Sequence, residues 1–270
     1  MSTTISLAHT TPDPTSSTVR SLIGKVAIVS GSSSGIGLAI ATELSVRGST
    51  VVINYPSPEV FEEASRAVGF IVGPSLLVCA DMSSKDGPGL LVNATMEKFG
   101  RIDIVVNNAA LAINLPLEET TLDHWDSLVN LNARGTFLLT QSALPYLTVG
   151  SGRIINICST SSRGAPPLQT VYAGTKGMVD SFTRCWAKEL PPKYGCTVNA
   201  VSPGPTKTAG FLSAGEEAMK ILQPTIEQTP AGKRMGEPDE IAYAVACLCE
   251  EKARWINGAH LFVNGGLHID

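Results

Sequence analysis

The sequence predicts one α/β domain whose core is a doubly wound parallel sheet of about seven strands, with helices on both faces. Its 270 residues suit one large domain. The strand-like runs are apolar along their whole length, as in strands buried on both faces. Amphipathic segments of helix length separate most of them, which implies right-handed crossovers. The strand-like runs are residues 25–30, 50–54, 75–80, 103–107, 153–158, 197–202 and 259–264.

The remaining stretches complete the predicted organisation. Residues 1–23 are rich in Ser and Thr and are expected to form a disordered extension, which leaves 24–270 as the folded domain. Residues 205–236 are rich in Gly, Pro and Met, break the alternating pattern, and are expected to cover a substrate site. The predicted helices are residues 35–48, roughly 58–68, 86–99, 122–148, 170–190 and 238–250.

The composition excludes several classes of function. The net charge is −4, without a long Lys/Arg run, so no nucleic-acid partner is expected. No apolar run has the length needed to span a bilayer, so no membrane association is expected either. The six cysteines are scattered, which argues against a metal site and favours free thiols in a reducing compartment, here the cytoplasm.

A glycine-rich loop follows the first predicted strand and opens the first predicted helix. Gly31 would allow a tight turn, Gly35 would let the backbone approach a pyrophosphate, and Gly37 would let the helix pack on the sheet. The helix N-terminus would then offer amide N–H groups to phosphates. Such a loop alone is a weak signal, but its position between strand and helix favours a dinucleotide site over an ordinary turn.

The spacing G-x-x-x-G-x-G resembles that of the short-chain dehydrogenase/reductase family, whose fold is of the Rossmann type. Other segments resemble motifs of that family in the same order: NNAA (107–110), NLNARG (130–135), NICSTSS (156–162), YAGTK (172–176) and SPGPTKT (202–208). The C-terminal part is similar to the ketoacyl-reductase branch and to fungal secondary-metabolite ketone reductases. The resemblance implies that the cofactor contacts include Gly31, Ser33, Ser34, Gly35, Ile36, Gly37, Asn108, Ala109, Ala110, Tyr172, Lys176, Pro203, Gly204, Thr206 and Thr208.

The same resemblance implies a catalytic group of four residues. Tyr172 would supply the proton to a carbonyl oxygen, and Lys176, one helical turn away, would lower the pKa of the phenol. Ser159 lies thirteen residues before Tyr172 and is preferred over Ser161 and Ser162 as the carbonyl ligand. Asn132 would hold a proton-relay water. Singly, each could be a surface contact, a turn residue or a cap; together they indicate hydride transfer.

The end of the second predicted strand favours NADP(H) over NAD(H). NAD enzymes usually carry Asp or Glu there, whereas this chain has Asn54 and Tyr55, with Ser57 as an expected phosphate ligand. Asp81 and Met82 match the family's adenine-contacting pair. Against NADP(H), Ser34 stands where many NADP-dependent members have a basic residue.

The substrate is expected to be a small-molecule ketone, reduced to a secondary alcohol, that is bulky and hydrophobic, with polyketide, terpenoid, steroid and carrier-bound acyl compounds left open. Two alternatives remain: a cofactor-binding regulatory protein, and a non-redox lyase or isomerase on the same fold. The family resemblance also implies a homo-oligomer, a tetramer or a dimer. The expected substrate-lining residues are Leu111, Ile113, Arg163, Pro166, Leu168, Phe211, Leu212, Met219 and Met235.

Overall fold

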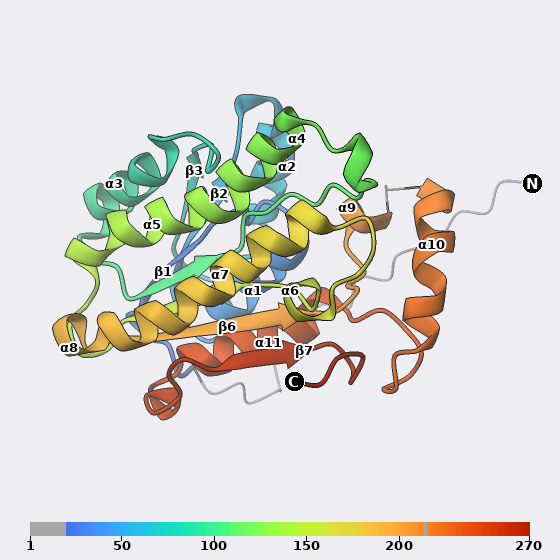
Figure 1. Ribbon diagram of the computed structural model, residues 1–270. Helices are drawn as coiled ribbons and strands as arrows, with labels where there is room; N and C mark the ends of the chain where they lie inside the picture. The colour runs from blue at the N-terminus through green and yellow to red at the C-terminus, as the bar shows by residue number, and fades with distance from the viewer. Residues whose placement is uncertain (1–19, 213–214) are drawn as a thin grey trace, which may run out of the picture.

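A computed structural model describes residues 20–212 and 215–270, with the side chains of 215–219 and 221 left aside. Seven parallel strands form one sheet in the order β3-β2-β1-β4-β5-β6-β7 (Figure 1), which confirms the predicted fold class. The strands are β1 (Val26–Val29), β2 (Thr50–Tyr55), β3 (Ser75–Cys79), β4 (Ile104–Asn107), β5 (Arg153–Ile157), β6 (Thr197–Pro203) and β7 (His260–Val263).

Helices cover both faces of the sheet because alternate residues of each strand point to opposite sides. In β1, Ala27 and Val29 pack in one core with α1 (Gly35–Val46), α2 (Phe61–Val68) and α11 (Pro238–Cys249). Val26 and Ile28 pack in the other core with α3 (Gly87–Phe99), α5 (Thr136–Ala143) and α7 (Thr170–Glu189). Both faces of β1 are therefore buried, as its apolar run predicted. The prediction fails for β3 and β7, which are only partly buried because they are the edge strands of the sheet.

The predicted helix 122–148 is not continuous. It comprises α4 (Leu122–Leu128), a π-helical segment η3 (Val129–Gly135), α5 and the 3-10 turn η4 (Leu144–Tyr146). The chain is closely packed at the end of this segment, where a Cβ on Gly135 would clash with the carbonyl oxygen of Met82. Wider π-turns of this kind are frequent at functional sites.

Residues 205–236, which the sequence predicts to cover the substrate site, contain two helices, α9 (Ala209–Leu212) and α10 (Gly215–Glu227). Both stand beside the sheet at the right of Figure 1. The two ends of this segment are held together, since the Gly236 N–H donates to the Pro205 carbonyl and the Lys207 N–H donates to the Gly236 carbonyl, each over 2.9 Å. The segment therefore leaves and rejoins the domain at one place.

The shorter helices are η1 (Pro58–Val60), η2 (Leu117–Glu119), α6 (Ser161–Gly164), α8 (Pro191–Tyr194) and η5 (Glu251–Ala253). Residues 1–19 of the predicted extension lie outside the described residues, whereas 20–23 pack on the domain, with Leu22 buried in the core. Within residues 20–212 and 215–270, no helix combines the length and the apolar character that a membrane crossing needs.

Candidate active site

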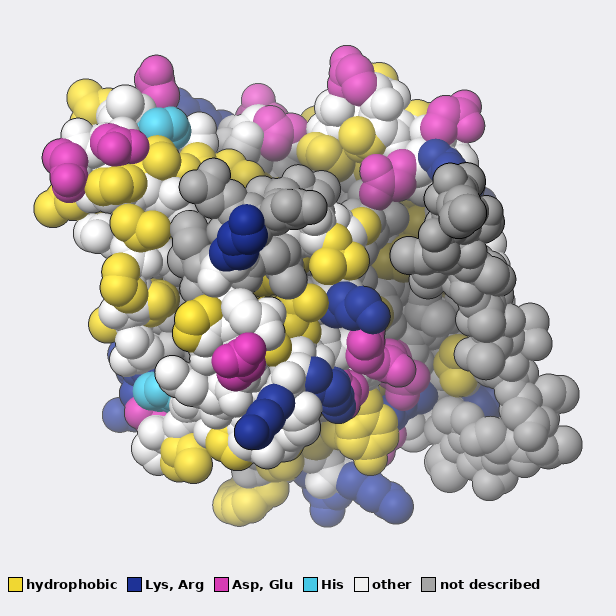
Figure 2. Space-filling model, turned by 90° about the vertical axis from the view of Figure 1, so that its right-hand side faces the viewer, with side chains coloured by type: hydrophobic (Ala, Val, Ile, Leu, Met, Phe, Trp, Pro, Cys, Tyr) yellow, Lys and Arg dark blue, Asp and Glu magenta, His cyan; other side chains and the backbone are white. Residues whose placement is uncertain are grey.

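A large cleft lies at the carboxyl edge of the sheet, where the chain leaves the parallel strands β1 and β4 toward opposite faces of the sheet. In open parallel sheets this is the place where ligands bind. The cleft measures about 940 Å³ and runs from Gly31 and Gly35 to Ser159, Tyr172 and Lys176. Figure 2, which looks at this end of the molecule, shows hydrophobic side chains over much of the face and Lys and Arg side chains singly or in small groups.

The glycine loop has the shape that a dinucleotide requires. Gly31 has a φ of +60°, and a Cβ there would lie 2.9 Å from the Cα of Ala109. A Cβ on Gly37 would lie 2.3 Å from the Gly31 carbonyl oxygen, so this glycine closes the loop on itself. A Cβ on Gly35 would meet nothing closer than 3.5 Å, a methyl group of Thr208 across the cleft. The backbone at Gly35 therefore faces open space beside the N-terminus of α1, a cradle that fits a pyrophosphate.

Asn108 fixes the position of this loop rather than presenting a free amide to the cleft. Its Nδ2 donates to the carbonyls of Ser30 and Gly31 at 2.9 and 3.0 Å. The Ser30 hydroxyl in turn accepts the N–H groups of Asn108 and Ala109, both at 3.0 Å. Asn107 points the other way and donates to Thr140 and Asn156. The ends of β1 and β4 are thus bound to each other.

Asn54, at the end of β2, is a second support of the glycine loop. Its Oδ1 accepts the Gly31 N–H at 2.9 Å and its Nδ2 donates to the Ala80 carbonyl at 2.9 Å. The residue is buried, although one side of it borders the cleft. Its amide is therefore already occupied in holding the loop, and the hydrogen bonds it makes are to the protein.

Replacing Asn54 with alanine is expected to destabilise the protein by about 2–3 kcal/mol, because a buried N–H and a buried carbonyl lose their partner. The affinity for a dinucleotide should fall about tenfold, equivalent to about 1.4 kcal/mol of binding free energy, because the glycine loop is less well ordered. Urea unfolding and fluorescence titration would measure these two effects. Asn93→Ala, on the exposed side of α3, is the matched control. An unchanged urea midpoint for Asn54→Ala would show that the amide does not support the loop.

The other residues expected near the adenine and its ribose divide into two groups. Asp81 and Met82 line the cleft; the Asp81 carboxylate accepts hydrogen bonds from the backbone N–H and hydroxyl of Ser83. Tyr55 and Ser57 are not among the lining residues. Tyr55 is buried against Phe61, with the ring centroids 6.1 Å apart.

Ser57 instead bonds the Glu59 carboxyl and thereby lowers its pKa. Ser33, in the glycine loop, is also absent from the lining. Lys176 is the only Lys or Arg among the described lining residues. Among the described lining residues, no arginine or second lysine is therefore available to a phosphate on the adenine ribose.

Ser159, Tyr172 and Lys176 meet at the inner end of the cleft. Ser159 follows β5, and its Oγ accepts the Ser161 N–H at 3.1 Å. Tyr172 and Lys176 lie one turn apart on α7, and the Lys176 Nζ is 6.0 Å from the centroid of the Tyr172 ring. That ammonium donates to the Ile157 carbonyl at 2.8 Å. The structure thus brings together three of the four residues that the sequence grouped.

Burial controls the protonation of this group. It raises the pKa of Tyr172, and the hydrogen bond with Ser159 opposes it only in part. It lowers the pKa of Lys176 to about 8. The lowering expected from the sequence involves Lys176 together with the positive nicotinamide of an oxidised cofactor, whereas burial is the largest effect on the pKa of Tyr172 in the structure. Tyr172 is therefore a protonated phenol at neutral pH.

Asn132 stands behind this group, in η3, and does not line the cleft. Its Nδ2 donates to the Leu111 carbonyl and to the Thr175 hydroxyl, at 2.9 and 3.1 Å, and its Oδ1 accepts the Leu111 N–H at 2.8 Å. Both amide protons are thus occupied within the protein. In this arrangement Asn132 links the 111 loop to α7 next to Lys176.

The segment after β6 forms the wall opposite the glycine loop. Pro203, Gly204, Thr206 and Thr208 all line the cleft, as expected. A Cβ on Gly204 would lie 2.9 Å from the Cβ of Asn264, so this wall packs closely on the chain that follows β7. Thr206 is buried and its hydroxyl donates to the Gly204 carbonyl.

The substrate end of the cleft is mostly apolar. Leu111, Pro166 and Phe211 line it as expected, whereas the expected Ile113, Arg163, Leu168, Leu212 and Met235 do not, and the side chain of Met219 lies outside the described residues. Neighbours that the motifs did not indicate are Ala112, Asn114, Leu131, Thr160, Gly164, Gln169, Gly210, Leu222, Thr225, Leu267 and His268. Most of these come from segments without a family motif, so only the fold reveals them.

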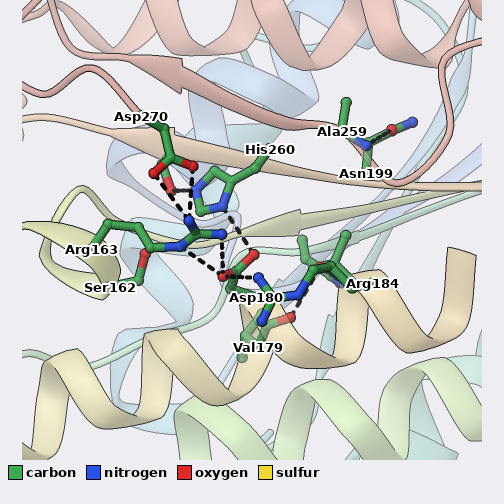
Figure 3. Close-up of polar contacts among 12 residues, drawn as sticks. Ser162, Arg163, Val179, Asp180, Arg184, Asn199, Ala259, His260 and Asp270 are labelled. Atoms are coloured by element: carbon green, nitrogen blue, oxygen red, sulfur yellow. Dashed lines mark hydrogen bonds and ion pairs between the residues drawn. The ribbon is translucent and has the colours of Figure 1, made fainter.

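An ion-pair network holds the turn after Ser159 against α7 (Figure 3). Arg163 of α6 donates to the buried Asp180 carboxylate at 3.0 and 2.9 Å, and to Asp270 at 3.1 and 2.8 Å. Arg184 and His260 also contact Asp180, at 2.6 and 2.9 Å. Since α7 carries Tyr172, the network fixes the serine segment relative to the tyrosine.

Comparison with known proteins is consistent with this arrangement. A family model described as enoyl-(acyl carrier protein) reductase matches residues 31–268. The short-chain dehydrogenase/reductase FrzI of Cladobotryum sp is 39% identical over 254 residues, which cover 92% of this chain and 97% of the relative. Versicolorin reductase 1 of Dothistroma septosporum is 34% identical over 256 residues, covering 91% and 96%.

Solved structures agree with the fold. A short-chain dehydrogenase from Burkholderia cenocepacia J2315 in complex with NADP has a TM-score of 0.84 and 32% identity, covering 92% of this chain and 99% of its own. The angucycline C-6 ketoreductase LanV with bound NADP also has a TM-score of 0.84 and 32% identity, covering 92% and 96%. The resemblance extends over almost the whole described domain.

Proposed function

This chain belongs to the short-chain dehydrogenase/reductase family and is an oxidoreductase, and from that premise we propose that it reduces a bulky, hydrophobic ketone to a secondary alcohol with NADPH. The observation that carries the proposal is one continuous cleft. It begins at the cradle beside Gly35 and ends at Ser159, Tyr172 and Lys176, with apolar side chains beyond them. A hydride donor and a carbonyl would meet at that end.

The residues act on the carbonyl oxygen. The nicotinamide, when bound, supplies the hydride to the carbonyl carbon. Tyr172, protonated at neutral pH because burial raises its pKa, gives a proton to the oxygen that becomes the alcohol. Ser159 donates its hydroxyl hydrogen bond to the same oxygen and stabilises the charge that develops there. Its Oγ is pre-oriented because it already accepts the Ser161 N–H.

Lys176 supplies a buried positive charge. With a pKa of about 8 it is mostly an ammonium at pH 7. One of its protons is used by the Ile157 carbonyl, so two remain for the hydroxyls of the cofactor's ribose. Asn132 positions Leu111 and Thr175 through the hydrogen bonds that its amide donates. The proposal also includes a proton-relay water held by Asn132.

NADP(H) is proposed over NAD(H) on two grounds. The chain has no carboxylate at the end of β2 that would bind a free ribose 2′-hydroxyl and repel a 2′-phosphate, since that place holds Asn54 and Tyr55. Two structural neighbours, from B. cenocepacia and LanV, contain NADP. Among the described lining residues Lys176 is the only Lys or Arg, so we expect the preference for NADP(H) over NAD(H) to be moderate and not exclusive.

A comparison of the two cofactors tests this proposal. We expect NADPH to bind about 10–100-fold more tightly than NADH, a difference of about 1.4–2.8 kcal/mol. Fluorescence titration would measure both affinities, and a panel of bicyclic aryl ketones would then be followed by cofactor oxidation. Transfer of deuterium from labelled NADPH into the alcohol identifies reduction and separates it from a lyase or isomerase reaction. Binding of neither cofactor would refute the proposal.

The substrate class follows from the walls of the cleft. Leu111, Pro166, Phe211, Leu222 and Leu267 offer apolar surface beyond the catalytic group. The names versicolorin reductase and angucycline ketoreductase belong to relatives of this chain. Together these observations favour a polycyclic ketone over a small polar one.

A homo-oligomer forms part of the proposal. Trp125, Phe137 and Met178, on α4, α5 and α7, leave 51%, 40% and 42% of their surfaces exposed. Large apolar side chains exposed on neighbouring helices favour burial against a second copy of the chain.

A further inference from the structure

The chain after β7 forms part of the substrate end of the cleft, and His268 is its polar member. Leu267 and His268 both line the cleft. No described Lys or Arg lines this end, and the walls beside it are largely apolar. A histidine in such surroundings needs either a partner within the protein or a ligand that supplies one.

The position of His268 is fixed by contacts on both sides. The Asn264 Nδ2 donates to the His268 carbonyl at 2.8 Å, and the Leu267 N–H donates to the Asn264 carbonyl at 3.2 Å. The imidazole packs against the Phe262 ring, with centroids 4.8 Å apart. Beyond it, Asp270 is paired with Arg163, as Figure 3 shows. His268 is therefore held at the cleft by both of its flanks.

Neither ring nitrogen of His268 has a hydrogen-bond partner among the described residues. Nε2 is shielded from solvent and unpaired. Nδ1 is the nearest atom to the place that a Cβ on Gly164 would take, at 4.0 Å, and Gly164 also lines the cleft. Nδ1 is therefore the ring nitrogen next to Gly164, a residue of the cleft wall, whereas Nε2 is shielded from solvent.

Because Nε2 is shielded and Nδ1 lies beside a cleft residue, the two nitrogens differ in how well each can carry the ring hydrogen. A buried N–H without an acceptor is rarer in proteins than a buried acceptor without a donor. For an imidazole that carries one hydrogen we therefore assign the lone pair to the shielded Nε2 and the hydrogen to Nδ1. His268 then presents a hydrogen-bond donor to the cleft.

We propose that His268 selects ketones that carry a second oxygen, a hydroxyl, ether or carbonyl oxygen on the ring system, which accepts a hydrogen bond from Nδ1. This inference rests on the proposed reductase function and names a specificity-determining residue for it. The second oxygen orients an otherwise apolar substrate, so that its reacting carbonyl meets Ser159 and Tyr172. An unsubstituted ketone of the same shape would bind by its apolar surface alone.

The test compares 1-tetralone with its ring-hydroxylated and ring-methoxylated derivatives, using the full chain and NADPH. For the unaltered protein, the KM of the better oxygenated ketone isomers should be about tenfold below that of 1-tetralone, as one hydrogen bond provides. His268→Phe keeps the ring packing and should abolish the difference in KM between 1-tetralone and its oxygenated derivatives. His268→Asn, which can place an N–H near the Nδ1 position, should restore most of it. Ile269→Ala, at an 84% exposed neighbour, is the matched control.

The outcomes separate this inference from the proposed function. If His268→Phe retains the full preference for the oxygenated ketones, or if none of their isomers is preferred, the assignment of His268 is overturned while reduction stands. A preference for the hydroxyl but not the methoxy derivatives would overturn the donor role of Nδ1. If no ketone is reduced and NADPH does not bind, the reductase proposal itself fails, and the titration shows this independently of His268.

Discussion

Tyr172→Phe is expected to lower kcat for ketone reduction by about a thousandfold, within the range that a positioned acid contributes. The substitution removes the phenolic proton and the hydrogen bond with Ser159 but leaves the ring in place. The affinity for NADPH should change by less than about threefold, because the loop contacts of Gly31, Asn54 and Asn108 are far along the cleft. Single-turnover kinetics and fluorescence titration would measure the two quantities.

The control for this substitution is Tyr146→Phe, at a tyrosine that is 44% exposed in η4, the turn that follows α5. It should leave both quantities unchanged. A kcat within tenfold of the unaltered protein for Tyr172→Phe would mean that another group delivers the proton. Loss of NADPH binding together with activity would mean that the variant has disturbed the cleft, and circular dichroism would identify that case.

The sequence was sufficient for the sheet, the glycine loop and the Ser159–Tyr172–Lys176 group because each depends on local patterns. Runs of apolar residues set the strands, and the spacing of Tyr172 and Lys176 places them on one helical face. The choice of Ser159 came from the family resemblance, and the structure places this residue shortly after β5. These features require no knowledge of which segments meet in space.

The hydrogen-bond partners of polar side chains were harder to predict from the sequence, because these partners lie far apart along the chain. Asn54 resembles a cofactor ligand at the end of β2, yet its amide joins Gly31 to Ala80. Tyr55 is next to it in the sequence, but the strand alternation turns it away into the packing against Phe61. Asn132 likewise supports Leu111, because a π-helical turn rather than a regular helix carries it.

The substrate end shows the same limit. His268 stands in no motif, and only the path of the chain after β7 brings it to the cleft. The signal available in the sequence was a lone histidine close after an apolar strand, which is more often a packed residue than a ligand contact. The unpaired Nε2, on which the proposal for His268 partly rests, is visible only in the structure.

The buried Lys176 is expected to cost the protein stability while serving its chemistry. In the unfolded chain a lysine holds its proton up to a pKa of about 10.5, whereas in the folded protein burial lowers that pKa to about 8. The folded state thus binds fewer protons between these values, and below pH 8 the full penalty applies, about 3 kcal/mol. As the pH rises from 8 toward 10.5 the penalty disappears.

Lys176→Met should therefore stabilise the cofactor-free protein at pH 7 by about 2 kcal/mol, since loss of the hydrogen bond to the Ile157 carbonyl returns about 1 kcal/mol of the gain. The stabilisation should shrink toward zero or reverse near pH 10, while kcat falls by about a hundredfold or more, as for other groups acting in proton transfer. Urea unfolding at both pH values measures the first effect, and NADPH must be absent because bound ligand adds its own stability.

The control is Lys188→Met, at an exposed lysine on the same helix, which should change neither stability nor its pH dependence appreciably. A destabilised Lys176→Met at pH 7 would mean that the ammonium is better solvated within the protein than its burial implies. A stabilisation that stays constant up to pH 10 would mean that better packing, and not the lost charge, is its source. The predicted result is a variant that is more stable and nearly inactive. It would show that the buried ammonium lowers the stability of the protein at the same site where it supports the proposed reaction.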